Sequence, residues 1–146
     1  MPPNGFVSPE DAALDGFPRH LCHVVASRVN GDIAYVLLNT GSHARPYLYG
    51  AHCERIDGAW HEGHSSNASG WSKIGSDDDR GTMTLWDDAP PYADRARAKF
   101  NGESREAPVE NGAFLFVWWN VGCPEDWPEL EAFRIAGRWE PIAPGR

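Results

Sequence analysis

Closely spaced turn dipeptides constrain the fold of this chain more than any other feature of its sequence. The four clearest are Asn30-Gly31, Asp57-Gly58, Asn101-Gly102 and Asn111-Gly112. Asn, Asp and Gly tolerate the positive φ angles that a two-residue type I′ turn requires at its centre. Ala136-Gly137 is a weaker fifth signal of the same kind. The spacing therefore predicts a chain of successive antiparallel hairpins.

Short strands are expected on both sides of these turns. The predicted strands cover 21–29, 32–39, 46–56, 59–65, 82–87, 94–100, 103–109, 113–121, 130–135 and 138–142. About ten short strands at this spacing are typical of two packed sheets or of a barrel. We predict an all-β fold, an antiparallel β-sandwich, with a β-barrel or a small α+β cone as the alternatives.

One short helix is expected near the N-terminus. Ser8 has the side chain of an N-cap, Pro9 suits the first helical position, and two acidic residues follow in the first turn. The helix is predicted to run to about Leu14 and to end before Gly16. Residues 1–8 are expected to be loose.

The size of the chain favours one domain. A length of 146 residues is in the commonest range for a single domain, and 41% hydrophobic residues with seven tryptophans provide a sizeable core. We therefore predict one domain over 1–146. Its longest polar stretch, 65–80, is predicted to be a long loop.

The net charge argues against several classes of partner. With 13 Lys and Arg against 21 Asp and Glu, the formal charge is −8, which repels phosphate backbones and anionic lipid surfaces. Neither nucleic-acid nor membrane binding is expected. The apolar run 113–119 is much shorter than the roughly 20 residues of a membrane-spanning helix. The N-terminal sequence lacks the pattern of a secretory signal, so a cytoplasmic location is predicted.

Several segments carry a resemblance to a known group of proteins. They are 8–14, 30–36, 55–60 and the Ser/Asn/Gly-rich stretch before Trp71, in a chain with two Lys and eleven Arg. With these segments the chain resembles small uncharacterised proteins of actinomycete bacteria, a family that implies no known activity. The Asp57-Gly58-Ala59-Trp60 turn is also similar to the hairpins of cystatin-like (NTF2-like) cones.

The hairpin around Asp57-Gly58 holds a possible metal site. A two-residue turn places Glu54 opposite His61 and His52 opposite Gly63. His52, Glu54 and His61 then share one face, and two histidines with one carboxylate can bind zinc or iron. The alternative is that this face is a solvated polar surface and that the aromatic-rich opposite face is buried. No cofactor is the first expectation, and zinc or iron is the alternative.

The cysteines do not form a recognisable site. Cys22, Cys53 and Cys123 are widely spaced and odd in number, which fits neither a disulfide framework nor a CxxC metal site. A Cys–His pair across strands could form a nucleophile. Packed, reduced thiols are the alternative. The sequence contains no motif of the common serine hydrolases, P-loop proteins or dinucleotide-binding proteins.

Aromatic residues beside polar loops suggest a binding function. Trp71, Trp86 and Trp127 stand in or beside such loops, where large amphipathic rings often contact a ligand or a partner. Tyr47 and Tyr49 are added to this candidate surface. The alternative is that each ring seals one end of the core. The strand around 114–119, apolar on both faces, is predicted to be a central core strand.

Three functions follow from these patterns. The leading hypothesis is a non-catalytic binding or protein-interaction domain whose partner is an unknown protein or small molecule. The second is a small metal-dependent or acid–base enzyme that uses the His/Glu cluster, so whether the chain is an enzyme is left open. The third is an acidic inhibitor or immunity-type protein that uses 77–79 and 125–126 against a basic partner.

Overall fold

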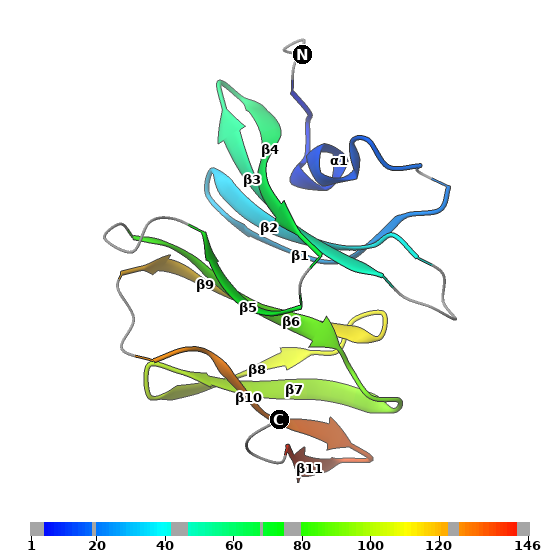
Figure 1. Ribbon diagram of the computed structural model, residues 1–146, viewed down its shortest axis with the longest axis vertical. Helices are drawn as coiled ribbons and strands as arrows, with labels where there is room; N and C mark the ends of the chain where they lie inside the picture. The colour runs from blue at the N-terminus through cyan, green and yellow to red at the C-terminus, as the bar shows by residue number, and fades with distance from the viewer. Residues whose placement is uncertain are drawn as a thin grey trace. The chain divides into compact units, whose positions relative to one another are not determined.

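The computed structural model describes residues 5–18, 20–41, 47–67, 69–74, 80–122 and 126–142. Within these ranges the chain forms eleven strands and one short helix, and the strands make three open antiparallel sheets (Figure 1). The prediction of an all-β fold with one N-terminal helix is confirmed. The chain divides into two compact units, Met1–Ser69 and Gly70–Arg146. The single domain over 1–146 stays a prediction.

The first unit is a four-stranded meander with one helix. Its strands follow one another in the sheet in sequence order, β1-β2-β3-β4, and consecutive strands pair antiparallel. The elements are α1 (Pro9–Leu14), β1 (His23–Asn30), β2 (Ile33–Asn39), β3 (Leu48–Ile56) and β4 (Ala59–Ser66).

Helix α1 begins and ends where its sequence predicts. The Ser8 side chain accepts a hydrogen bond from the Asp11 backbone N–H at 3.1 Å, which satisfies one of the otherwise unpaired donors at the helix start. Beyond the helix, Gly16 takes a φ of 88°. Ala12 and Ala13 are buried in a cluster with side chains from β2, β3 and β4: Ala34, Val36, Leu38, Ala51, Cys53 and Trp60. The helix thus covers one face of the sheet.

The segment before α1 is attached to strand β4. Phe6 and Trp60 exchange two backbone hydrogen bonds, of 3.0 and 2.8 Å. Beside them, a Cβ on Gly5 would come within 2.4 Å of the Ala59 Cβ, so only a glycine fits this close approach. Residues 5 and 6 are therefore attached to the sheet, and the expectation that they are loose is wrong. Residues 1–4 lie outside the described residues.

The second unit is a sandwich of two sheets. One sheet has the order β5-β6-β9 and the other β11-β10-β7-β8. The strands are β5 (Gly70–Ile74), β6 (Gly81–Asp88), β7 (Ala93–Phe100), β8 (Glu103–Pro108), β9 (Ala113–Val121), β10 (Glu129–Ile135) and β11 (Arg138–Pro141).

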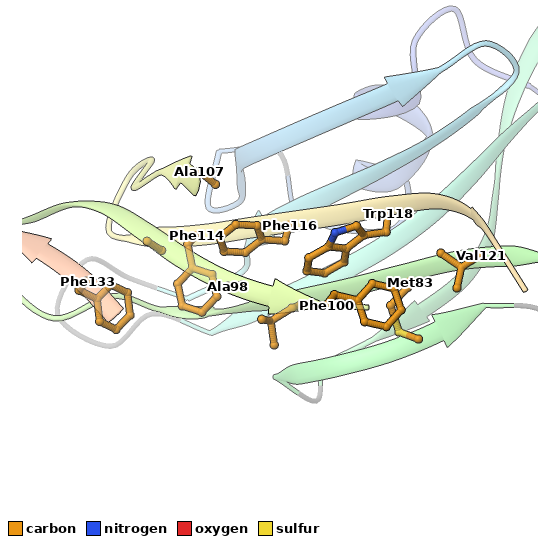
Figure 2. Close-up of a cluster of buried hydrophobic side chains, with 11 residues drawn as sticks. Met83, Ala98, Phe100, Ala107, Phe114, Phe116, Trp118, Val121 and Phe133 are labelled. Atoms are coloured by element: carbon orange, nitrogen blue, oxygen red, sulfur yellow. The ribbon is translucent and has the colours of Figure 1, made fainter. Parts of the chain in front are cut away.

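Aromatic side chains from both sheets form the core of this sandwich (Figure 2). Phe114 of β9 lies edge-on to Phe133 of β10, with ring centroids 5.6 Å apart. The ring centroid of Trp118 of β9 lies 5.1 Å from that of Phe100 of β7. Burial of these rings is the largest apolar contribution that the unit can make to its stability. The run 114–118 is thus core, as predicted, but β9 lies at an edge of its sheet rather than at the centre.

Most of the predicted turns have the expected geometry. Both central residues have positive φ angles at Asp57-Gly58, Asn101-Gly102, Asn111-Gly112 and Ala136-Gly137. The first turn differs by one residue, because Asn30 pairs with Ile33 and the loop is Gly31-Asp32. Here only Gly31 has a positive φ, of 62°, as in a type II′ turn.

Candidate functional site

The predicted register of the β3–β4 hairpin is correct near the turn and wrong farther from it. Glu54 pairs with His61 as expected, but the register shifts between His52 and Cys53. His52 therefore pairs with His64, and Gly63 is the extra residue of a β-bulge. The two-residue turn therefore determines the register only as far as this bulge, and a glycine inside a strand often marks one.

The three residues of the predicted metal site are placed in different surroundings. His52 is buried, with 4% of its surface exposed, whereas Glu54 is exposed and His61 is half-buried. The His61 imidazole lies against Gly5, whose Cβ position is 3.1 Å from Nε2. In the described ranges, no group of three or more His, Cys, Asp or Glu is arranged to hold a metal ion. Zinc or iron binding therefore stays a prediction that no contact supports.

The surroundings of His52 favour the neutral form of its imidazole. Burial lowers its pKa, and the positive form of His64 lowers it further, while the charge of Glu54 raises it. The opposite effects of Glu54 and His64 follow from their places beside His52 on one face of the hairpin. The polar face of this hairpin is thus partly buried, rather than solvated along its whole length.

The opposite face of the hairpin is buried at Ala51, Cys53 and Trp60, and it contains a thiol. Cys53 has no exposed surface, and its Sγ lies 3.7 Å from the backbone oxygen of Pro9. Burial raises the pKa of this thiol to about 12, and the nearby carboxylates of Glu62 and Glu10 act in the same direction. A protonated, buried thiol is a poor nucleophile. Cys22 is also buried, and Cys123 lies outside the described residues.

The Glu62 carboxyl group on this face is unusual in its surroundings. Burial raises its pKa, against hydrogen bonds from Ser65 and Tyr49 that lower it. The Tyr49 hydroxyl lies 3.5 Å from Glu62 and also bonds to Ser65, and its ring packs edge-on against Phe17. The contacts of Tyr49 are therefore internal to the first unit.

Tyr47 differs from Tyr49 because 54% of its surface is exposed. Its hydroxyl accepts a hydrogen bond from the Asn67 side chain, and its backbone oxygen accepts one from the Thr40 N–H at 2.8 Å. These bonds connect the ends of strands β2, β3 and β4. Tyr47 thus remains available for binding, although it belongs to the first unit and the three candidate tryptophans belong to the second.

Trp86 is a core residue. It is only 1% exposed and lies within β6, paired with Gly70 of β5 and Leu115 of β9. Its neighbourhood in the sequence, rich in Asp and Pro, suggested a loop position. The strand instead continues to Asp88, so Trp86 lies between two neighbouring strands. Its assignment to a binding surface is wrong.

Trp71 and Trp127 form an exposed aromatic pair in the second unit. Their rings stack nearly parallel, at an interplanar angle of 7° and a centroid distance of 4.3 Å. Even so, Trp71 keeps 47% of its surface exposed and Trp127 keeps 52%. Trp71 stands on strand β5, inside the stretch predicted as the long loop 65–80, and Trp127 precedes β10. We call these two residues the tryptophan pair.

The predicted acidic loops are described only in part. Residues 77–79 and Glu125 lie outside the described residues, so the acidic-inhibitor hypothesis stays a prediction there. Asp126 is described, and its carboxylate accepts a hydrogen bond from the Asn101 backbone N–H at 3.2 Å. Among the described helices, none is long and apolar enough to cross a membrane.

Comparison with known proteins provides no relative for this chain. No protein-family model, no curated protein and no solved structure matches it. The resemblances to actinomycete proteins and to cystatin-like hairpins therefore stay predictions. Function has to be inferred from the geometry of the described residues.

Proposed function

We propose that this chain is a binding domain that recognises a segment of a partner protein through the tryptophan pair. The observation that carries the proposal is the combination of stacking and exposure: two indole rings 4.3 Å apart, each with about half of its surface in water. Trp86 in the same unit is nearly inaccessible, at 1% exposure. The pair is thus the part of the predicted aromatic surface in this unit that a partner can reach.

Stacking prepares the pair for binding. Each ring restricts the rotation of the other, so less conformational entropy is lost when a partner is bound. Tryptophan is among the residues that most often dominate the energy of a protein interface, because one ring buries a large apolar area and still donates a hydrogen bond. The edges and outer faces of the two rings provide such an area without a rearrangement of the core.

The charge of the chain indicates which partner is favoured. A net charge of −8 attracts basic segments and accelerates their association. We therefore propose a partner segment in which an apolar or aromatic side chain contacts the indoles and lysine or arginine residues flank it. The enzyme and inhibitor hypotheses stay predictions, since no contact within the described ranges favours them.

A peptide library displayed on phage tests this proposal. Random peptides selected on the wild-type protein are expected to be enriched in apolar residues flanked by basic ones. Peptides so selected are expected to bind Trp71→Ala and Trp127→Ala at least about tenfold more weakly, a difference of about 1.4 kcal/mol.

Tyr92→Ala is the matched control, because Tyr92 is an aromatic residue of the same unit with 90% of its surface exposed. Its binding should equal that of the wild type. If no peptides are enriched, or if those enriched bind the two tryptophan variants as tightly as the wild type, the proposal is wrong.

A further inference from the structure

A polar hollow in the second unit contains two arginines and is separate from the tryptophan pair. It has a volume of about 270 Å³ and lies where strands β7, β8 and β9 reach their ends. The residues that matter for its chemistry are Arg80, Asn101, Glu103, Arg105, Trp118 and Asn120. None of these residues is predicted from the sequence to bind a ligand.

Among the described residues, Arg80 bonds to a neutral side chain and backbone, those of Asn120. Its Nε donates to the Asn120 side-chain oxygen at 2.8 Å, and a terminal nitrogen donates to the Asn120 backbone oxygen. Asn120 has a φ of 56°, a left-handed conformation that asparagine tolerates better than most residues. A Cβ on Gly122 would lie 3.1 Å from the other terminal nitrogen of Arg80, so the glycine leaves room for the guanidinium group.

Arg105 is held in a similar way by neutral groups. One terminal nitrogen donates to the backbone oxygen of Val117 at 2.8 Å. The guanidinium carbon lies 5.2 Å from the ring centroid of Trp118, which is within range of a cation–π interaction. Trp118 is itself fixed in the core against Phe100 and Phe116. These two contacts with uncharged groups give the arginine a defined orientation.

The two arginines differ from others in the described part of the chain. Ion pairs there join Arg55 to Asp32, Arg95 to Glu106, Arg97 to Glu131 and Arg134 to Asp94. None of these ion pairs involves Arg80 or Arg105, and within the described ranges both arginines bond to uncharged amide oxygens. Glu103 lines the same hollow, so the charged side chains among its described lining residues sum to one positive charge. In a protein of net charge −8, such a concentration of positive charge is notable.

We propose that this hollow binds a small hydroxycarboxylate, a ligand with one carboxylate and neighbouring hydroxyl groups. The guanidinium group matches the carboxylate in shape and charge and can donate two parallel hydrogen bonds to it. Glu103 and the amide of Asn101 provide acceptors for hydroxyl groups on the same ligand. The hollow is smaller than the 300–1,000 Å³ that is common for drug-sized ligands, so the ligand is a small molecule.

Titrations followed by nuclear magnetic resonance test this site. The probes are glucuronate, gluconate and glycerate, each of which has one carboxylate and neighbouring hydroxyl groups. Each is added to the whole protein, and the signals observed are the arginine Nε–H and tryptophan indole N–H groups. We expect saturable shifts at Arg80, Arg105 and Trp118 with at least one probe. Glucose, which has hydroxyl groups but no carboxylate, should produce none.

Variants of both arginines test their role in the binding. Arg80→Gln and Arg105→Gln are each expected to weaken binding at least about tenfold, because each removes a charged donor. Arg138→Gln, which changes an exposed arginine outside the hollow, should bind as the wild type does. The dispersion of the spectra shows whether each variant is folded, and Arg105→Lys, which keeps the charge, replaces Arg105→Gln if that variant is not.

Three results would overturn the proposal. They are the absence of saturable shifts with all three carboxylates, equal binding by the arginine variants and the wild type, and equal or tighter binding of inorganic phosphate. The last result would assign the hollow to a tetrahedral anion instead. Because none of its residues belongs to the tryptophan pair, this site can fail while the peptide-binding proposal holds, and the reverse is also true.

Discussion

Residues with similar sequence surroundings have different roles in this molecule. Trp86 and Trp127 both stand next to acidic residues and close to prolines, yet one is 1% exposed and the other 52%. The sequence around each residue contains no signal that separates them. What differs is the pairing of the backbone: Trp86 lies in a strand with neighbours on both sides, and Trp127 precedes a strand.

This difference predicts two distinct losses of stability. Trp86→Ala should lower the free energy of unfolding by about 3–5 kcal/mol, because it leaves a cavity in a packed region. Trp127→Ala should lower it by only about 0.5–1.5 kcal/mol, since it removes one stacking contact at the surface. Urea denaturation of the two variants measures both values. Equal losses would show that the exposure of the pair has been wrongly assigned.

Cys53 provides a prediction about pH. Its pKa is about 12 in the folded chain against an ordinary value of 9.0, so the folded state holds the thiol proton more tightly than the unfolded state does. The contribution to stability is complete below pH 9.0 and is lost as the pH rises toward 12. Between pH 9.0 and 12, the free energy of unfolding should fall by about 1.4 kcal/mol for each pH unit because of this thiol.

Cys53→Ala lacks this titration, so its free energy of unfolding should fall less steeply than that of the wild type over the same range. The comparison of slopes cancels the ionisation of tyrosines and lysines, which the two proteins share. Parallel slopes would mean that the fold does not raise the pKa of the Cys53 thiol.

Among the secondary-structure elements, the hairpins were the most predictable. Two-residue turns with Asn or Asp before Gly determine both the position of a turn and the register next to it, as at Asp57-Gly58. Register was lost where a bulge intervened, at Gly63. Strand β5 was missed because Gly70–Ile74 is short, polar and flanked by Ser, Asn and Gly, and it gains strand structure by pairing with β6.

The N-terminal extension of the first sheet predicts the effect of one methyl group. Gly5→Ala would bring a Cβ within 2.4 Å of the Ala59 Cβ, so the segment should separate from β4. Hydrogen exchange at the Phe6 and Trp60 amides should become faster, because these amides form the two bonds to that segment. The free energy of unfolding should fall by about 1–2 kcal/mol.

Gly63→Ala in strand β4 is the matched control. A Cβ there would lie 3.6 Å from the nearest atom outside its chain neighbours, the His52 backbone oxygen, which is an ordinary contact. Exchange at Phe6 should then remain as slow as in the wild type. If both variants behave alike, the close approach of Gly5 to β4 does not hold the segment.

For the whole molecule, the sequence predicted the class of fold and singled out Trp71 and Trp127, but it predicted neither their stacking nor the arginine hollow. Alternating apolar residues and turn dipeptides are local signals, and they were sufficient for an all-β chain with a core around 114–118. The tryptophan pair joins residues far apart in the chain, and the arginine hollow joins β7, β8 and β9 with Arg80. No local pattern encodes such contacts, because they depend on how strands from distant parts of the chain pair.

The tryptophan pair is the surface that we propose binds a partner protein. This is tested by following the indole N–H resonances of the tryptophans while a selected peptide is added to the wild-type protein. We expect saturable shifts at Trp71 and Trp127 and an unchanged resonance for Trp86, which is buried. If a peptide binds without shifting Trp71 or Trp127, the tryptophan pair is not the binding surface, and recognition takes place elsewhere on the molecule.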